Sequence, residues 1–216
     1  MGSGRFTARE ASEILAPGDR VAGVRFHARD TEPCDAVVVA TGYGTGLRGA
    51  GLGGSAIWTV QGYSLTARAK PDAMRVSVTD PKRRLVFARL GETVRVAGIA
   101  DIGPREFAFD QSRFDTFRAA ARSCFPGAYD AADAEGWSDA RPCAPDSRPL
   151  IGRGKVRGLY LNLGHGACGW TLCLGAADRG GAHHRRRHRL STRADCATIL
   201  IAAKGYAAAA RMIWCP

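Results

Sequence analysis

Two kinds of pattern are missing from this sequence of 216 residues: cysteine pairs in the spacing C-x-x-C, and long runs of uncharged apolar residues. The seven cysteines are an odd number without a repeated spacing, so we expect buried thiols and no disulfide framework. No window approaches the roughly 18 apolar residues of a membrane-spanning helix. The start, MGSGRFTARE, has no apolar core of a secretory signal. These absences predict a cytoplasmic location.

Acidic residues are scarce relative to basic ones: 20 Asp and Glu stand against 31 Lys and Arg, a formal net charge of +11. Such an excess invites a nucleic-acid-binding interpretation. However, residues 178–216 hold 8 Lys and Arg against 2 Asp and Glu, so more than half of the excess lies there. Basic runs such as HHRRRH are usually solvated, and no aromatic residues interrupt this one. We therefore expect no nucleic-acid partner.

A zinc site is a further alternative for the same segment, with His183, His184, His188 and Cys196 as its ligands. Adjacent histidines do not easily share one tetrahedral site, and the second cysteine of a pair is missing. We therefore expect no metal.

Hydrophobic residues make up 45% of the chain and 27 residues are glycine, so a sizeable core with many turns is expected. The run DAVVVATG at 35–42 is continuously apolar, which is typical of a strand buried on both faces. Alternating segments at 56–68, 74–80, 85–92 and 93–101 predict an antiparallel meander with one exposed face. The pattern indicates an α+β fold.

Helical periodicity is clearest at 109–125, where Asp110 can cap the N-terminus and Pro126-Gly127 can end the helix. A looser helical pattern covers residues 6–16. Another helix starts at 167–177, directly after the buried strand LYLNL.

The residues after Ala177 change in character. We expect Asp178-Arg-Gly-Gly to break the preceding helix, and HHRRRHRL has no amphipathic period. The chain then ends in an apolar segment without a polar face or a cap. This abrupt switch suggests the hypothesis of a reading-frame change.

A glycine-rich turn lies between LYLNL and the following helix; it contains Gly164, His165, Gly166 and Gly169. Glycines let a backbone approach a flat or anionic ligand closely. The helix N-terminus offers free N–H groups and a partial positive charge. Such a turn suits a phosphate, or a ring that gains negative charge on reduction. A tight turn that serves packing alone is the alternative, and a lone His165 is more often structural.

Arg141 precedes Pro142 and the run C-A-P-D-S-R-P-L-I-G. Its planar guanidinium can hold a carboxylate by two hydrogen bonds, although a surface salt bridge is the alternative. The end of the apolar run, Ala40-Thr41-Gly42, suits a backbone that lies close to a nucleotide, although any buried strand could carry it.

Taken together, DAVVVATG, QGYSLT, WSDARPCAPDSRPLIG and LYLNLGHGACGWT occur in the order seen in flavin-dependent D-amino-acid dehydrogenases. The chain resembles the C-terminal part of this family, whose relatives include glycine oxidase and other amine-oxidising flavoproteins. The resemblance covers roughly residues 20–177.

The resemblance implies a fragment of a FAD-binding α/β domain plus a substrate domain built on an antiparallel sheet. Residues 1–55 would be the remnant of the FAD-binding domain, 56–140 the substrate domain with one helix, and 141–177 the return to the FAD-binding domain. Residues 178–216 would be an aberrant basic and apolar tail.

The resemblance also implies the site residues and the cofactor, a noncovalently bound FAD. Arg141 would grip the substrate carboxylate, and Tyr63 would line the pocket. The residues expected to contact FAD are Ala40, Thr41, Gly42, Gly164, His165, Gly166 and Gly169.

By the same resemblance, the reaction is the oxidation of a D-amino acid. A hydride would pass from the substrate Cα to the flavin, and water would hydrolyse the imino acid to a 2-oxo acid and ammonia. Electrons would then pass to the respiratory chain, which implies a cytoplasmic enzyme or one attached peripherally to the inner membrane.

The sequence departs from the family in two places. The strand, G-x-G-x-x-G turn and helix that bind the FAD pyrophosphate do not occur in these residues, and no periodic helix follows the glycines at 42–54. Gln61 stands where the family has lysine. We therefore expect weak or absent flavin binding and impaired activity, with an inactive truncated fragment as the alternative.

Overall fold

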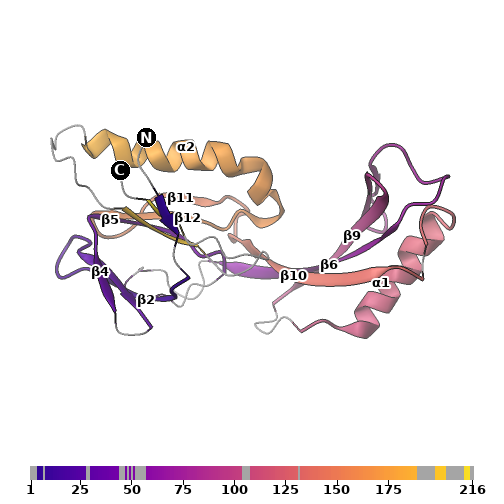
Figure 1. Cartoon of the computed structure of the whole chain (residues 1–216), viewed down its shortest axis with the longest axis horizontal. Coiled ribbons are helices and arrows are strands. Elements are labelled where there is room, and N and C mark those ends of the chain that lie inside the picture. The colour runs from indigo at the N-terminus through magenta and orange to yellow at the C-terminus, as the bar shows by residue number, and fades with distance from the viewer. Residues whose placement is uncertain are drawn as a thin grey trace. The chain divides into compact units, whose positions relative to one another are not determined.

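The computed structural model describes residues 4–6, 8–27, 30–43, 47, 49, 51, 57–103, 108–130, 132–188, 198–202 and 212–214, with side chains left out for 4–6 and from 180 onward. The chain divides into two compact units, one formed by residues 1–58 with 141–216 and the other by 59–140. Figure 1 labels the main elements of both units. The functional roles expected for the segments stay predictions, and most of the glycine-rich connector 42–54 lies outside the described residues.

The first unit contains a six-stranded sheet in the order β1-β14-β13-β5-β12-β11. Its strands are β1 (Gly4–Phe6), β5 (Ala36–Ala40), β11 (Leu150–Arg153), β12 (Leu159–Leu163), β13 (Thr198–Ala202) and β14 (Met212–Trp214). The apolar run 35–42 forms β5, which pairs in parallel with β12 and with β13. The predicted strand is confirmed, but only one of its faces is completely buried: Val37 and Val39, which share a face, are 0% exposed, whereas Val38 and Ala40 on the other face are partly buried.

Residues 6–16 do not form the helix that their loose periodicity suggests. Instead Ala11–Leu15 is strand β2, which joins β3 (Gly23–Phe26) and β4 (Thr31–Pro33) in a three-stranded antiparallel sheet. Ile14 enters the core of this unit, and Glu13 pairs with Arg25 on β3. Pairing with β3 outweighs the local preference, because a helix this short gains little stability by itself.

The expected helix break at residues 178–181 is also wrong. Helix α2 runs from Gly169 to His188, through Asp178 and the two glycines that follow it. A glycine inside a helix costs about 1 kcal/mol relative to alanine, but it leaves the backbone hydrogen bonds intact. Two glycines therefore weaken a helix without ending it.

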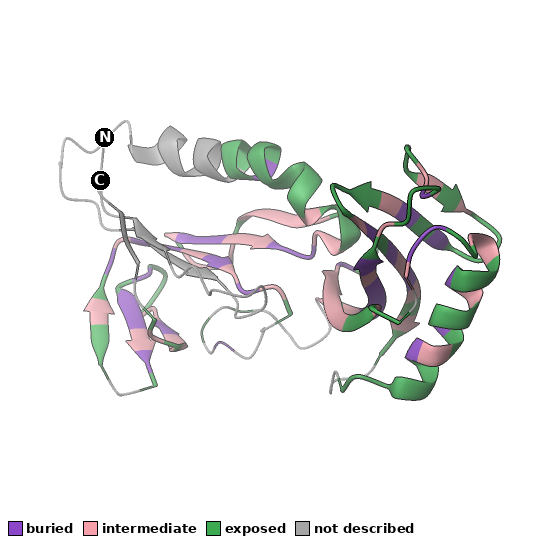
Figure 2. Cartoon of the chain, turned by 45° about the vertical axis from the view of Figure 1, so that its right-hand side comes forward, coloured by how far each residue is buried: buried purple, intermediate pink, exposed green. Residues whose placement is uncertain are grey.

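The second unit has a five-stranded antiparallel sheet in the order β10-β6-β9-β8-β7. Its strands are β6 (Trp58–Arg68), β7 (Val78–Asp80), β8 (Leu85–Leu90), β9 (Thr93–Ile102) and β10 (Glu135–Cys143). The first residue of β6 and the last three residues of β10 belong to the first unit. The antiparallel pairing predicted from the alternating segments is confirmed, and β7, β8 and β9 follow one another as a meander, but β6 pairs with β9 and not with β7. Figure 2 shows buried segments along these strands.

Helix α1 (Gln111–Cys124) confirms the helix predicted at 109–125. The Asp110 carboxylate accepts hydrogen bonds from the backbone N–H groups of Ser112 and Arg113, at 2.9 and 3.1 Å, and so caps the helix. Phe114, Phe117 and Ala121 of α1 are buried in the core of this unit.

None of the helices in the described part of the chain is long and apolar enough to cross a membrane.

Candidate functional site

The carboxyl ends of the parallel strands β5 and β12 bring two of the predicted FAD-contacting segments to one edge of the sheet. In their register Leu161 pairs with Val39, so both strands end at the same level. Ala40, Thr41 and Gly42 end β5 and follow it, while Gly164 follows β12. Ligands of open α/β sheets commonly bind outside the carboxyl ends of such strands. The structure thus places these two segments where a nucleotide would be expected.

The turn after β12 has a backbone that glycine makes possible. Gly164 and Gly166 adopt positive φ angles of 77° and 57°, which side-chain-bearing residues rarely adopt. A Cβ atom on Gly164 would lie only 2.8 Å from Ile57 Cδ1 and 3.2 Å from the Ala144 nitrogen. The chain then forms a short 3₁₀ turn, Gly166–Cys168, and α2 begins at Gly169. The N–H groups of the first turn of α2 have no partner within the helix.

His165 lies inside this turn and is half-buried. Burial lowers the pKa of its imidazole from 6.5, so the ring is neutral at pH 7. A neutral imidazole offers one donor and one acceptor but no positive charge. His165 can therefore hydrogen-bond a ligand at this turn without adding charge to it.

Arg141 lies near the end of β10 and is half-buried. Cys143, two residues later, forms an isolated antiparallel bridge with His165, which joins the end of β10 to the glycine turn. Among the described residues Arg141 forms no ion pair, so the surface salt bridge that its residue type suggested is not seen there. Its guanidinium can therefore donate hydrogen bonds to the carboxylate of a ligand.

Tyr63 lies in the second unit, where its contacts are those of a core residue. Its side chain is 2% exposed, and the Tyr63 hydroxyl accepts a hydrogen bond of 3.3 Å from the backbone N–H of Asp110. The Tyr63 ring also meets Phe109 edge-on, with centroids 5.7 Å apart. These contacts support a packing role, and the pocket-lining role stays a prediction.

Gln61 is buried on the same strand. Its amide donates hydrogen bonds to the Ala108 carbonyl and to Ser138 Oγ, at 3.1 and 3.4 Å. The polar group at this position is therefore satisfied within the second unit.

Among the described residues of the first unit, two buried polar atoms, Thr41 Oγ1 and Asn162 Oδ1, have no hydrogen-bond partner. Buried polar atoms usually have a hydrogen-bond partner, so such unpaired atoms indicate that a ligand or a water molecule forms hydrogen bonds with them. Asn162 was missed by the sequence analysis, although it is the polar residue of the strand LYLNL. These unpaired atoms and the glycine turn, whose residues Ala167 and Cys168 are exposed, fit a bound flavin nucleotide.

Metal ligands do not gather in the part of the chain that is described: no group of three or more His, Cys, Asp or Glu side chains there could hold a metal ion. The zinc candidates His183, His184, His188 and Cys196 lie outside the described side chains, as do the basic side chains of HHRRRH.

The family model described as FAD dependent oxidoreductase (DAO) matches residues 3–179. The chain belongs to this family. Membership of the family makes it a relative of FAD-dependent oxidoreductases. The expected α+β fold is confirmed by two solved structures of glycine oxidases, which are described below.

Two curated relatives are D-amino acid dehydrogenases. D-amino acid dehydrogenase 2 of Ralstonia nicotianae is 40% identical over 178 residues, which cover 77% of this chain and 42% of that protein. D-amino acid dehydrogenase 2 of Pseudomonas aeruginosa is 38% identical over 173 residues, 78% of this chain and 41% of that protein. The chain thus spans about two-fifths of the length of these curated relatives.

Glycine oxidase of Geobacillus kaustophilus has a similar structure, with a TM-score of 0.69 and 20% identity; the match covers 82% of this chain and 48% of that one. Glycine oxidase of Bacillus cereus matches with a TM-score of 0.66 and 19% identity, over 82% of this chain and 50% of that one. At such low identity these likenesses show the fold alone.

Proposed function

We propose that this chain carries part of the site of a FAD-dependent D-amino-acid dehydrogenase. The observation that supports this most strongly is the glycine turn Gly164–Gly169, which follows a parallel strand and is joined through Cys143 to the strand of Arg141. The names of the two curated relatives support a D-amino acid as the substrate.

In this proposal Arg141 holds the substrate carboxylate by a bidentate, charge-assisted pair. The turn Gly164–Gly169 would contact FAD, and the N-terminus of α2 would stabilise negative charge on it. FAD, when bound, supplies the hydride acceptor for the substrate Cα–H. The imino acid that leaves is hydrolysed by water to a 2-oxo acid and ammonia.

The neutral His165 and the orphan atoms of Thr41 and Asn162 would complete hydrogen bonds to the flavin or to its bound water. Ala40 and Gly42 would contribute backbone to the same contact. The respiratory chain is the proposed electron acceptor, and the proposed location is the cytoplasm or a peripheral position on the inner membrane.

For the isolated 216-residue chain we propose weak flavin binding and impaired turnover, because no periodic helix follows the glycines at 42–54, so they do not form the strand–turn–helix unit that holds the FAD pyrophosphate. Purified protein with a stoichiometric flavin absorbance would contradict this part of the proposal. The absence of any flavin binding, even at high FAD concentration, would instead support the alternative of an inactive fragment.

The role of Arg141 is tested with Arg141→Gln in the presence of excess FAD and an artificial electron acceptor. Losing a charge-assisted contact of this kind should raise KM for a D-amino acid at least about tenfold. The affinity for FAD should stay unchanged. Arg153→Gln, an exposed arginine on β11, is the matched control and should leave KM unchanged. An unchanged KM in Arg141→Gln would remove the carboxylate-binding role.

A further inference from the structure

We propose that Cys143 is a positioning residue that couples the strand of Arg141 to the glycine turn, so that one side chain sets both parts of the site. The inference rests on the proposed function for its catalytic meaning. The contact itself is a property of the first unit, and it can be tested without FAD.

The backbone of Cys143 and its neighbour connects the two segments. Cys143 bridges to His165, and the next residue, Ala144, donates its N–H to the Gly164 carbonyl at 3.3 Å. On the turn side, the Cys168 N–H donates to the His165 carbonyl at 3.1 Å. A displacement of Cys143 and Ala144 therefore moves the turn as well.

The Cys143 side chain fills the space between these backbones. Its Sγ lies 3.6 Å from the Arg141 carbonyl oxygen, as a weak donor to it. The same sulfur would lie 3.3 Å from a Cβ atom on Gly166, so it packs directly against the glycine with φ +57°. One thiol thus contacts the backbone of Arg141, the residue proposed to bind the carboxylate, and the turn proposed to face the flavin.

The chemical state of this thiol fits a packing role. Burial raises its pKa, and the positive charge of Arg141 only partly opposes that rise. The thiol is therefore neutral at pH 7, and it behaves as a small apolar group rather than a nucleophile. Cys173 on α2 is exposed and offers a matched control.

The first test is hydrogen exchange of the chain without FAD, read at the amides of Ala144 and Cys168. Cys143→Ala removes the sulfur that separates the two backbones, so exchange at both amides should rise about threefold to tenfold. Cys143→Ser keeps a donor of similar size and should restore most of the protection. Cys173→Ser should change neither amide.

The second test adds FAD and a D-amino acid. Cys143→Ala should raise the Kd for FAD and KM by about threefold to tenfold, with kcat nearly unchanged, and Cys143→Ser should again recover most of the loss. A purely structural role would lower stability without this KM-against-kcat split.

The outcomes separate the two proposals. Unchanged exchange at Ala144 and Cys168 in Cys143→Ala overturns the coupling, whether or not flavin binds. Faster exchange at both amides with an unchanged Kd and KM overturns the positioning role. If the unmodified chain binds no FAD, the proposed function fails, while the exchange data still decide whether Cys143 holds the turn.

Discussion

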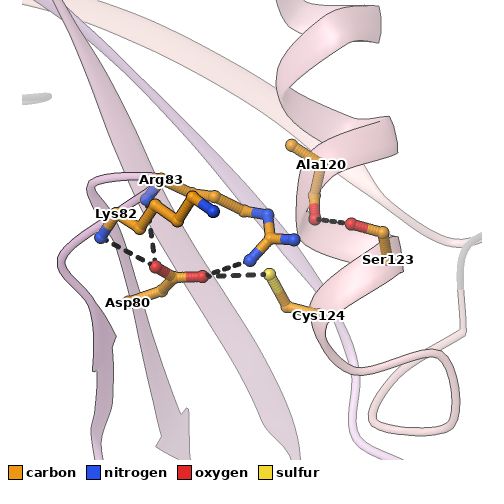
Figure 3. A network of polar contacts seen from close by, with 6 residues as sticks. All are labelled: Asp80, Lys82, Arg83, Ala120, Ser123 and Cys124. Carbon is orange, nitrogen blue, oxygen red and sulfur yellow. Dashed lines mark hydrogen bonds and ion pairs between the residues drawn. The ribbon is translucent and has the colours of Figure 1, made fainter.

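Asp80 shows how one side chain can organise a turn of the second unit. Its carboxylate accepts hydrogen bonds from the backbone N–H groups of Lys82 and Arg83, at 2.9 and 3.0 Å, and pairs with the Arg83 guanidinium at 2.8 Å (Figure 3). The Cys124 thiol, at the end of α1, donates to the same carboxylate at 3.6 Å. The hydrogen bonds from the Arg83 backbone N–H and the Arg83 guanidinium, with a smaller contribution from the Lys82 backbone, favour the ionised form and lower the pKa of Asp80 from 3.8 to about 2.

This pKa predicts an acid-dependent contribution to stability. Because the folded-state pKa is depressed, the contribution is present above about pH 4 and is lost as the pH falls from about 4 through about 2. Urea unfolding of the protein and of Asp80→Asn at pH 7, 4 and 2.5 would test this, and the stability difference should shrink with falling pH. Asp72→Asn, an exposed carboxylate of the same unit, is the control. A pH-independent difference would contradict the prediction.

At the scale of elements, the glycines of α2 and of the turn before it differ in backbone conformation and in the space around them. Gly175 lies inside α2 with open space where a Cβ would be, whereas Gly164 has positive φ and close neighbours. Figure 2 shows the first turns of α2 as mostly exposed, and Trp170 and Leu174 are 91% and 83% exposed. Helix propensity, not packing, therefore governs substitutions at Gly175.

We predict that Gly175→Ala raises the free energy of unfolding by about 0.5–1 kcal/mol, because alanine is the better helix former. Gly164→Ala should lower it by at least about 1 kcal/mol, because the left-handed backbone disfavours a Cβ and the added atom meets Ile57. Urea denaturation followed by circular dichroism would measure both. Destabilisation by Gly175→Ala would indicate that α2 packs against something there or is not helical.

At the scale of the whole molecule, the two units differ in which segments of the chain form them. The second unit is one continuous segment, from Thr59 to Ala140, whereas the first unit combines the two ends of the chain. Strand β13, from the segment expected to be an aberrant tail, pairs with β5 over five register positions, from Thr198 with Ala36 to Ala202 with Ala40.

Deletion of residues 198–216 should therefore destabilise the first unit. It removes the ladder beside β5, at a cost of about 2 kcal/mol or more, and leaves an open strand edge that favours aggregation. Hydrogen exchange at Val37–Ala40 should rise sharply, while the amides of α1 in the second unit should not change. Deletion of Cys215 and Pro216 alone is the control. Unchanged exchange in β5 would support the aberrant-tail interpretation.

Local sequence correctly predicted the elements in which a clear hydrophobic pattern is bounded by residues that begin or end that type of element. The run at 35–42 is apolar throughout, and α1 has a capping aspartate and a Pro-Gly stop, so both were predicted correctly. Strand β2 and the full length of α2 were not, because the loose period of residues 6–16 and the glycines after Asp178 give weak local signals. For β2, pairing with β3 outweighed the weak helical preference. For α2, the backbone hydrogen bonds of the helix outweighed the unfavourable helix propensity of the glycines.

The same division holds for the candidate site. The sequence by itself determined its parts, since the glycine turn, Arg141 and the end of β5 are visible as residue types in a recognisable order. Only the tertiary structure decided which parts meet: the bridge from Cys143 to His165 and the parallel register of β5 with β12 join residues far apart in the chain. It also showed Tyr63 held in a core and the orphan oxygen of Asn162. Pairing between distant strands depends on long-range packing, which local periodicity does not encode.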